Sequence, residues 1–476
     1  MQYLLGRRQF VIARSPVTID PSWKVRPLPD GWLLSSQEEL AISDRTVDGR
    51  AVLVLGVPDG EETLDTATSG RYAMIDWPFV STDQGAGLLP AFYAAGGGVV
   101  SSSAGLAASL ARGEAANGPA AFYPLPDHGE TLKFPSPMNY VPSPGTRYRR
   151  IRRLMRDQRL NIVTGEVEHR PAPLPAAGSY QQAVDAVAEE LTRAARVLRE
   201  RTPGRIHLQL TAGLDTRTML AAFSASGVAY ETVTFRYPFK PDEDASLAAT
   251  LSRELGVRHS VVEGKPTPDA AAGEAYLRQI AGNMNGVDLN FLFPCHAYRF
   301  LEAGDTMVGG LGFEVGRQKF RSQFGELDLG TATGAALWQG LTQGAGPSDF
   351  PAFIDEWLDW RRRHPYPFDL VASTYLDQRL GAWGATLLTG FDLLPGATVH
   401  PAASARVMAA MLSAPFEAQV EGRLQRDVIR ALAPTLLAHP FNPVPLRRQL
   451  RGVVSRAKRR VRKLLGQGRP PAASAS

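Results

Sequence analysis

Apolar and polar residues alternate along the first third of the chain in short runs. The clearest of these runs are residues 51–55, 72–75 and 99–102. Turn signals such as Pro58-Asp-Gly60 separate them, and a Thr-Gly pair inside residues 160–168 predicts one further hairpin. A Pro-rich linker follows at residues 171–175. We therefore predict a β-rich domain over residues 1–174.

Beyond residue 175 the pattern becomes one of alternating helices and strands. Residues 180–201 place apolar side chains at helical spacing, which predicts an amphipathic helix. Predicted strands then alternate with predicted helices: strands at 205–210, 230–235 and 257–262, and helices at 216–223 and 245–255. This order predicts an α/β fold with a doubly wound parallel sheet over residues 175–445, completed by C-terminal helices. Such sheets bind nucleotides at the carboxyl ends of their strands.

One strand, loop and helix in this domain form a candidate phosphate site. The loop at 211–215 has a single glycine, and Asp215 or Thr216 could cap the helix that follows. Loop amides and a helix N-terminus attract anions, whereas Asp215 would repel phosphate unless a divalent cation lay between them. Mg²⁺-bound pyrophosphate is therefore expected, with Thr211, Thr216 and Arg217 as further contacts. The ending of a Walker loop is missing, and an ordinary turn with a capping Asp is the alternative.

The loop Thr211-Ala-Gly-Leu-Asp-Thr216 resembles the Ser-Gly-Gly-x-Asp-Ser loop of the asparagine synthetase and N-type ATP pyrophosphatase families. The resemblance continues at Phe235, where those synthetases hold adenine, and through Asp242-Glu-Asp244 to Leu255-Gly-Val-Arg-His259. It implies ATP and Mg²⁺ as cofactors. The residues that it implies for binding them are Leu210, Thr211, Ala212, Gly213, Asp215, Thr216, Arg217 and Phe235.

A second loop is similar to the family's Gly-x-Gly-x-Asp-Glu sequence. Aligning Gly310-Leu-Gly312 places Glu314 at the Asp position and Val315 where the Glu belongs. The resemblance implies that Glu314 is catalytic and binds metal together with Asp215, while Arg317 could neutralise phosphate directly. A helix-start Glu after a glycine turn is the alternative. The family's catalytic Lys before a Phe is absent, and His439 is the nearest group that could exchange protons.

Residues 1–174 look like the class II glutamine amidotransferase domain of the same synthetases. The similarity lies in residues 70–75, 87–93 and 99–103. That domain's nucleophile is a Cys exposed after Met removal, but Gln2 stands there and Cys295 is the chain's one cysteine. We therefore expect a degenerate domain without glutaminase activity.

Together these features predict an AMP-forming amide ligase that adenylates a carboxylate and joins it to an amine or ammonia. The substrate would be a small molecule or a peptide. In character the chain is most similar to the macrolactam-forming cyclases of lasso peptides and to the β-lactam synthetases. The alternative is a non-catalytic relative that serves as a scaffold or regulator in a biosynthetic complex.

Charge changes the picture mainly at the C-terminus. The net charge is +5, but residues 447–469 carry ten Lys/Arg and no acidic residue, which leaves 42 basic against 47 acidic residues elsewhere. A nucleic-acid partner is therefore not expected. Residues 446–476 are predicted to form a basic amphipathic helix and a disordered end, which could lie on an anionic membrane surface, hold a partner or be solvated. One cysteine and no evident signal segment predict a cytoplasmic protein of unspecified oligomeric state.

Overall fold

The protein is described from a computed structural model. It covers residues 8–19, 21–47, 49–58, 70–113, 140–171, 178–236, 243–263, 300–318, 320–324, 328–342, 349–392 and 395–442. The predictions made for Gln2, Asp242, Cys295, most of the linker and the basic tail at 446–476 lie outside these residues.

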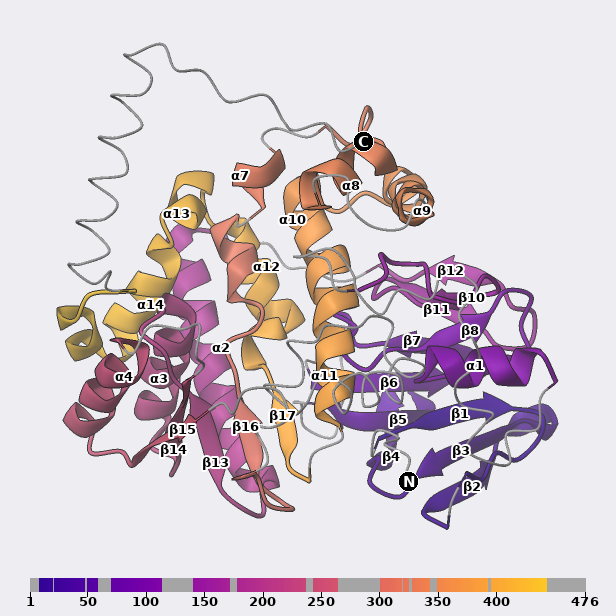
Figure 1. The fold of residues 1–476 in the computed structure, drawn as a ribbon, viewed down its shortest axis with the longest axis horizontal. Coiled ribbons are helices and arrows are strands. Elements are labelled where there is room, and N and C mark those ends of the chain that lie inside the picture. Colours follow the sequence, from indigo (N-terminus) through magenta and orange to yellow (C-terminus); the bar gives the residue numbers. More distant parts are fainter. Residues whose placement is uncertain are drawn as a thin grey trace, which may run out of the picture.

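Two antiparallel sheets form the N-terminal part of the chain (Figure 1). In spatial order the first contains β10 (Ile151–Arg153), β8 (Phe92–Ala94), β9 (Val99–Ser101), β1 (Phe10–Ala13), β3 (Leu33–Gln37) and β2 (Trp23–Pro27). The second contains β12 (Val167–His169), β11 (Gln158–Asn161), β7 (Phe79–Thr82), β6 (Gly70–Asp76), β5 (Arg50–Pro58) and β4 (Ile42–Val47). The predicted strands lie within β5, β6 and β9, and the predicted hairpin is β11 with β12.

The alternation within β1 explains how these sheets are stacked. Phe10 and Ile12 belong to one apolar cluster with side chains of β5 and β6, so they fill the space between the sheets. Val11 and Ala13 point to the other face and pack in a second cluster with helix α1 (Ala104–Ala111). Successive side chains of a strand point to opposite faces, so a strand that is apolar at every position is covered on both sides.

The second part of the chain is built on a five-stranded sheet in which every pairing is parallel. Its strand order is β15 (His259–Glu263), β14 (Glu231–Arg236), β13 (Ile206–Gln209), β16 (Thr306–Val308) and β17 (Ala397–Val399). Helices α2 (Tyr180–Arg201), α3 (Leu214–Ser226) and α4 (Glu243–Glu254) accompany it. The predicted α/β fold with a parallel sheet is confirmed, and α2 has the predicted bounds.

Two details of this sheet differ from the sequence prediction. The short strand β17 lies in a region that was predicted to be helical. Helix α3 begins at Leu214, and its N-cap is Gly213 in an extended conformation. Asp215 is therefore in the first helical turn, and the prediction that Asp215 or Thr216 caps the helix is wrong.

Helices and short turns make up the rest of the described chain. They are α7 (Arg321–Phe324), α8 (Gly334–Thr342), α9 (Phe350–Arg363), α10 (Leu370–Thr374), α11 (Ala385–Phe391), α12 (Ala405–Ser413), α13 (Phe416–Val420) and α14 (Arg423–Leu432), with one-turn segments η1 (Pro29–Gly31), η5 (Phe313–Arg317), η7 (Pro401–Ala403) and η8 (Pro434–Ala438). A π-helix, η6 (Tyr375–Gly384), joins α10 to α11 without a break. Residues 370–391 thus form one continuous helix, which lies between the β-sheets and the parallel sheet in Figure 1. Within the described ranges, no helix has the length and apolar character to cross a membrane.

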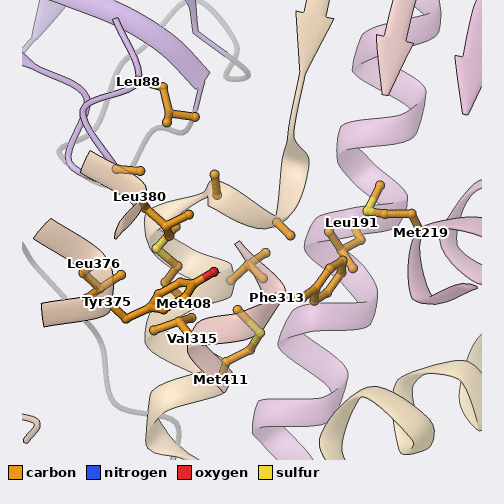
Figure 2. Close-up of a cluster of buried hydrophobic side chains, with 14 of the residues drawn as sticks. Leu88, Leu191, Met219, Phe313, Val315, Tyr375, Leu376, Leu380, Met408 and Met411 are labelled. Atoms are coloured by element: carbon orange, nitrogen blue, oxygen red, sulfur yellow. The ribbon is translucent and has the colours of Figure 1, made fainter. Parts of the chain in front are cut away.

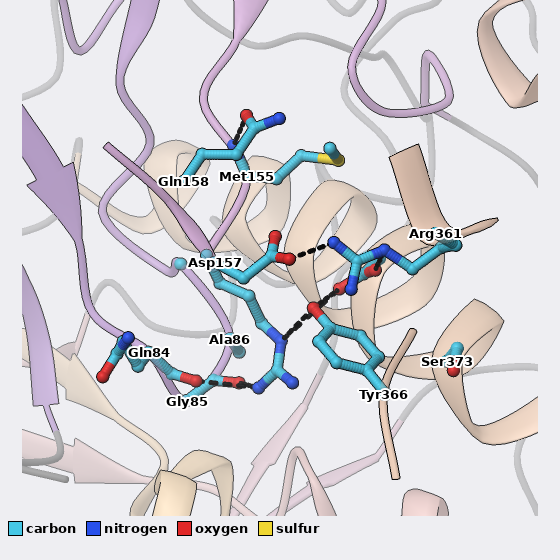
Figure 3. Close-up of polar contacts among 12 residues, drawn as sticks. Gln84, Gly85, Ala86, Met155, Asp157, Gln158, Arg361, Tyr366 and Ser373 are labelled. Carbon is cyan, nitrogen blue, oxygen red and sulfur yellow. Dashed lines mark hydrogen bonds and ion pairs between the residues drawn. The ribbon is translucent and has the colours of Figure 1, made fainter. Parts of the chain in front are cut away.

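A buried charge cluster joins the two parts of the chain (Figure 3). Asp157 of the β-sheet part pairs with Arg361 of α9, and both side chains are at most 1% exposed. Arg156 donates to the carbonyls of Gln84 and Gly85 at 2.7 and 2.8 Å and lies 3.4 Å from Asp377 of η6. Burial raises the pKa of Asp377, against the opposing attraction of Arg361 and Arg156. The charges in this interface are therefore matched across it.

The continuous helix is fixed to the β-sheet part at further points. Gln378 accepts a hydrogen bond from the amide of Ser143 and donates one to its carbonyl, both at 2.9 Å. Just past α11, Asp392 accepts bonds from Arg71 at 2.5 Å and from Arg8 at 2.9 Å. Burial alone would raise the pKa of Asp392, but the two arginines outweigh it and hold that pKa below its usual value.

We predict that Arg361→Met destabilises the protein by about 3–5 kcal/mol, because it leaves Asp157 and Asp377 buried with less positive charge. Denaturant unfolding measures this loss. The control is Arg258→Met, which breaks a surface pair with Glu231 in which Arg258 is 69% exposed. That change should cost less than about 1 kcal/mol. Equal losses from both variants would contradict the assignment of Arg361 to a buried interface.

Candidate functional site

The order of the parallel strands places two loops at the point where the sheet reverses direction. From β13 the chain continues to β14 and β15 on one side, and it then returns to β16 and β17 on the other. The loop after β13 and the turn after β16 are therefore neighbours at the carboxyl edge. A Cβ placed on Gly310 would lie only 3.3 Å from the Cβ of Asp215, so the two segments are in contact. In open α/β sheets, this reversal point is where ligands bind.

The loop after β13 is held by bonds within the protein. The hydroxyls of Thr211 and Thr216 are 3.0 Å apart, and the amide of Thr211 donates to the Thr216 hydroxyl at 3.1 Å. The amide of Gly213 donates to the Thr211 hydroxyl at 3.1 Å, and that of Ala212 to Asp244 of α4 at 3.1 Å. These amides were expected to bind phosphate, and here they stabilise the loop.

The N-terminus of α3 is the remaining candidate for binding an anion. Its N-cap, Gly213, supplies no side-chain hydrogen bond to the helix. The first N–H groups of a helix have no partner within the helix, and they point out of its positive end. The loop thus holds in place a helix N-terminus without a side-chain cap, and that end can receive an anion.

Asp215 in this first turn is paired with a cation of the protein itself. Its Oδ2 accepts a hydrogen bond from Nη2 of Arg317 at 2.5 Å, and its Oδ1 accepts one from the side-chain amide (Nε2) of Gln425 at 2.7 Å. Arg317 ends η5, the turn after β16, and Gln425 lies on α14. Three segments that are far apart in the chain therefore meet at one carboxylate.

Glu314 in the same turn is held by a tyrosine of the continuous helix. The hydroxyl of Tyr375 donates to Oε2 of Glu314 at 2.7 Å. Burial, together with the nearby carboxylates of Glu314 and Asp215, raises the pKa of Tyr375 well above its usual value, so the phenol stays protonated. Figure 2 shows the Tyr375 ring in an apolar cluster with Val315, Met408 and Met411. Packing thus fixes the hydroxyl that orients Glu314.

The expected Mg²⁺ does not fit Asp215 as it stands in this arrangement. Both carboxylate oxygens of Asp215 already accept bonds, one of them from a guanidinium that would repel a metal ion. Over the described part of the chain, no group of three or more His, Cys, Asp or Glu side chains is placed to hold a metal. The structure therefore gives Asp215 a different cation from the expected one.

The guanidinium of Arg217 is engaged within the protein, and its expected contact with phosphate stays a prediction. Its buried guanidinium lies 4.0 Å from the centroid of the Phe441 ring. It donates to four backbone carbonyls, those of Ala212 (3.2 Å), Leu436 (3.2 Å), His439 (2.7 Å) and Pro440 (2.9 Å). Burial lowers its pKa to about 10. Arg217 thus ties the loop to the segment after α14.

The structure does not bring the side chain of His439 into the site. Its Nε2 lies 2.9 Å from both carboxylate oxygens of Glu254, at the C-terminal end of α4. The loop contacts Asp244 at the opposite end of α4, about 15 Å away along the helix axis. The predicted role of His439 in proton exchange is therefore not supported.

Leu210 and Phe235 are buried residues at the ends of the strands next to the loop. Leu210 is fully buried, its amide donates to the Val233 carbonyl at 2.9 Å, and its carbonyl accepts from Thr234 at 2.7 Å. Phe235 lies near the carboxyl end of β14, where adenine was expected, but its ring is buried in the core next to Phe300. The Phe235 ring is therefore part of the core.

His400, which sequence reasoning missed, closes the other side of the turn after β16. Its Nδ1 accepts a hydrogen bond from the amide of Leu311 at 3.3 Å. A Cβ on Gly309 would lie 2.4 Å from the imidazole, so this position has room only for glycine. Burial lowers the pKa of His400 to about 4, and the ring is neutral at pH 7. Tyr375 and Gln425 were also missed, because nothing near them in sequence marks them as site residues.

Comparisons with known proteins find structures of low sequence identity and low TM-score. No protein-family model matches the chain, and no curated protein matches it. One similar structure is the glutamine-dependent NAD+ synthetase from Acinetobacter baumannii in complex with ADP, at 19% identity and a TM-score of 0.17. The similarity covers 27% of this chain and 23% of the synthetase, so the chain spans about a quarter of that protein.

Two further structures show a similarity of the same order. The NMN synthetase from Francisella tularensis is 13% identical, with coverage of 42% of this chain and 91% of that one and a TM-score of 0.21. The U34-tRNA thiolase NcsA from Methanococcus maripaludis, with its [4Fe-4S] cluster, is 11% identical, with coverage of 42% and 72% and a TM-score of 0.17. Scores of this size establish no family, and the asparagine synthetase family stays a resemblance. The α/β fold rests on the sheet topology itself.

Titration of His400 should make stability fall as the pH is lowered through a defined window. Its pKa is about 4 in the folded protein and about 6.5 when unfolded, so the unfolded chain binds more protons between these values. Stability contributed by the neutral ring is present above about pH 6.5 and lost as the pH falls towards 4. The melting temperature of His400→Gln should therefore decrease less than that of the wild type when the pH is lowered from 7 to 4.5. Identical losses would show that His400 does not titrate in this window.

Proposed function

We propose that the protein is an ATP-dependent, AMP-forming ligase that activates a carboxylate and joins it to an amine. One observation carries this proposal. The N-terminus of α3, which lacks a side-chain cap, lies beside the turn that contains Glu314 and Arg317, and both are at the reversal point of the parallel sheet. A helix N-terminus at this point suits a polyphosphate, and the turn beside it offers a guanidinium and a carboxylate.

The chemistry assigned to the site has two steps. A carboxylate oxygen of the substrate attacks the α-phosphorus of ATP, and the bond to pyrophosphate breaks. The negative charge that develops on the pyrophosphate faces the first turn of α3 and Arg317, whose fixed dipoles and charge stabilise it. The amine then attacks the acyl carbon, AMP leaves, and Glu314 is the carboxylate that would accept the amine's proton.

The substrate class follows from the resemblance described above. Asparagine synthetases use a glutaminase domain with a nucleophilic cysteine to supply ammonia, whereas the one cysteine of this chain, Cys295, lies outside residues 1–174. The nitrogen would therefore come from ammonia or from an amine substrate. We propose a peptide that carries both the carboxylate and the amine, as in macrolactam formation.

A non-catalytic scaffold is the second candidate, and three observations favour it. Asp215 is paired with Arg317 and Gln425, and the amides of residues 211–213 are bonded within the protein. The Lys that the family carries before Phe441 is also missing. Such a protein would bind ATP at most, without forming AMP. Product analysis therefore separates the two candidates.

We predict that Gly213→Asp abolishes ATP binding. An added Cβ would lie 3.2 Å from Oγ1 of Thr211, a close contact that the control variant Gly213→Asn shares. Gly213 is the N-cap of α3 at φ −75°, a conformation open to any residue, and Asp is a preferred N-cap. Its carboxylate would occupy the anion site and repel phosphate. In a thermal-shift titration, ATP at about a hundred times its dissociation constant should stabilise the wild type by about 2.7 kcal/mol and leave Gly213→Asp unchanged.

Gly213→Asn is the matched control, since it can cap the helix without adding charge. It should retain an ATP-dependent shift. A full ATP response from Gly213→Asp would place the nucleotide elsewhere and contradict the proposed site.

Turnover provides the test of the enzyme against the scaffold. Incubation of the wild type with ATP and a pool of peptides should yield AMP and pyrophosphate in equal amounts, and no ADP. Asp215→Ala should lose this activity because Arg317 is then no longer held beside the α3 N-terminus. ATP binding without AMP formation in any peptide pool would favour the scaffold.

A further inference from the structure

The expected metal ion and the observed arginine compete for the same carboxylate. Arg317 approaches Oδ2 of Asp215 to 2.5 Å, while Gln425 holds Oδ1 at 2.7 Å. A divalent cation at Asp215 would have to displace the guanidinium and then remain close to it. Like charges at such a distance repel strongly outside bulk water. The carboxylate therefore has its counter-charge already built into the chain.

The position of Arg317 is set by the backbone on both sides of it. The turn η5 starts after Gly312, whose φ of +115° excludes other residues. Its C-cap, Gln318, is in a left-handed conformation at φ 49°. The Gln318 side chain donates to that of Gln419 at 2.7 Å. The Arg317 stem packs against Gly422, where an added Cβ would lie 3.5 Å from Cδ. The backbone conformation and the contacts of this turn thus fix Arg317 beside Asp215.

Part of the guanidinium remains open to a ligand. The side chain is 30% exposed, and within the described ranges its one hydrogen bond is the Nη2 bond to Asp215. A guanidinium has five donor hydrogens in a planar fork, so several are left for phosphate oxygens. Arg317 can therefore hold Asp215 and an anion at the same time.

We propose that Arg317 takes the place of a divalent cation at Asp215, so that pyrophosphate binds here without a metal ion. The inference rests on the proposed function, since it concerns the same phosphate site. Arg317 bridges the Asp215 carboxylate to the pyrophosphate and removes the repulsion that the carboxylate alone would exert. Mg²⁺ that accompanies ATP would then contact phosphate oxygens only.

The test measures inorganic pyrophosphate binding to the full chain by calorimetry, once in EDTA and once in excess Mg²⁺. The wild type should bind with similar affinity in both. Arg317→Met should lose about tenfold or more in EDTA, as expected for a lost charge-assisted hydrogen bond. It should regain binding when Mg²⁺ is added, because the guanidinium no longer occupies Oδ2 of Asp215 and a metal ion can take its place. Arg317→Lys, which keeps the charge but not the fork, should fall between the two.

Arg321→Met is the matched control, because Arg321 is also partly exposed and pairs with Asp369 at 2.8 Å. It should bind pyrophosphate like the wild type. Pyrophosphate that still binds to Gly213→Asp must bind elsewhere on the chain, including the basic tail. This background is subtracted from the binding measured for the other proteins.

Wild-type pyrophosphate binding that disappears in EDTA would overturn the inference, as would unchanged binding by Arg317→Met in EDTA. In either case a wild type that still binds ATP would leave the proposed function standing. A wild type that binds neither ATP nor pyrophosphate under either condition would remove the proposed function together with the inference.

Discussion

The buried charges between the two parts of the chain are the constraint on which the site depends. Asp157 and Arg156 come from the β-sheet part, whereas Arg361 and Asp377 come from the helices beside the parallel sheet. Charges withdrawn from water are tolerated only when they are matched, so the two parts must meet in one register. That register fixes the helix at residues 370–391, and with it the hydroxyl of Tyr375 on Glu314.

This coupling shows what the N-terminal part contributes without a nucleophilic cysteine. Ser143, Arg71 and Arg8 all bond to the helix that carries Tyr375 or to the residue just past it. The helix includes a π-helical segment. Such segments are rare in proteins, and those that occur are often found at functional sites. The β-sheets thus serve as a support for one wall of the candidate site.

The sequence predicted the parts of this structure that depend on local pattern. The amphipathic period of residues 180–201 located α2. Alternating apolar residues located part of both kinds of sheet, namely β5, β6, β9, β13, β14 and β15. The three residues of β17 are too few for a period to emerge. The start of α3 was misplaced because both Asp215 and Thr216 are good capping residues, whereas the chain uses Gly213.

The site was predicted only in part, because its contacts span long distances in sequence. The resemblance to the asparagine synthetases pointed to Asp215, Glu314 and Arg317 as residues of one site. It did not predict the bond between Asp215 and Arg317, which are 102 positions apart. Gln425 is 210 positions from Asp215. Arg217 follows the loop directly and so had the pattern of a phosphate ligand. Only the path of residues 436–442 across the loop shows that its guanidinium is already engaged.

The most direct test of the account is hydrogen–deuterium exchange of the backbone amides with and without ATP. The central claim is that the first N–H groups of α3 and the turn after β16 receive the polyphosphate. ATP should then slow exchange in residues 211–217 and 309–317 and leave the strands of the β-sheet part unchanged. Protection that is absent from these two segments, or confined to another region, would contradict the account.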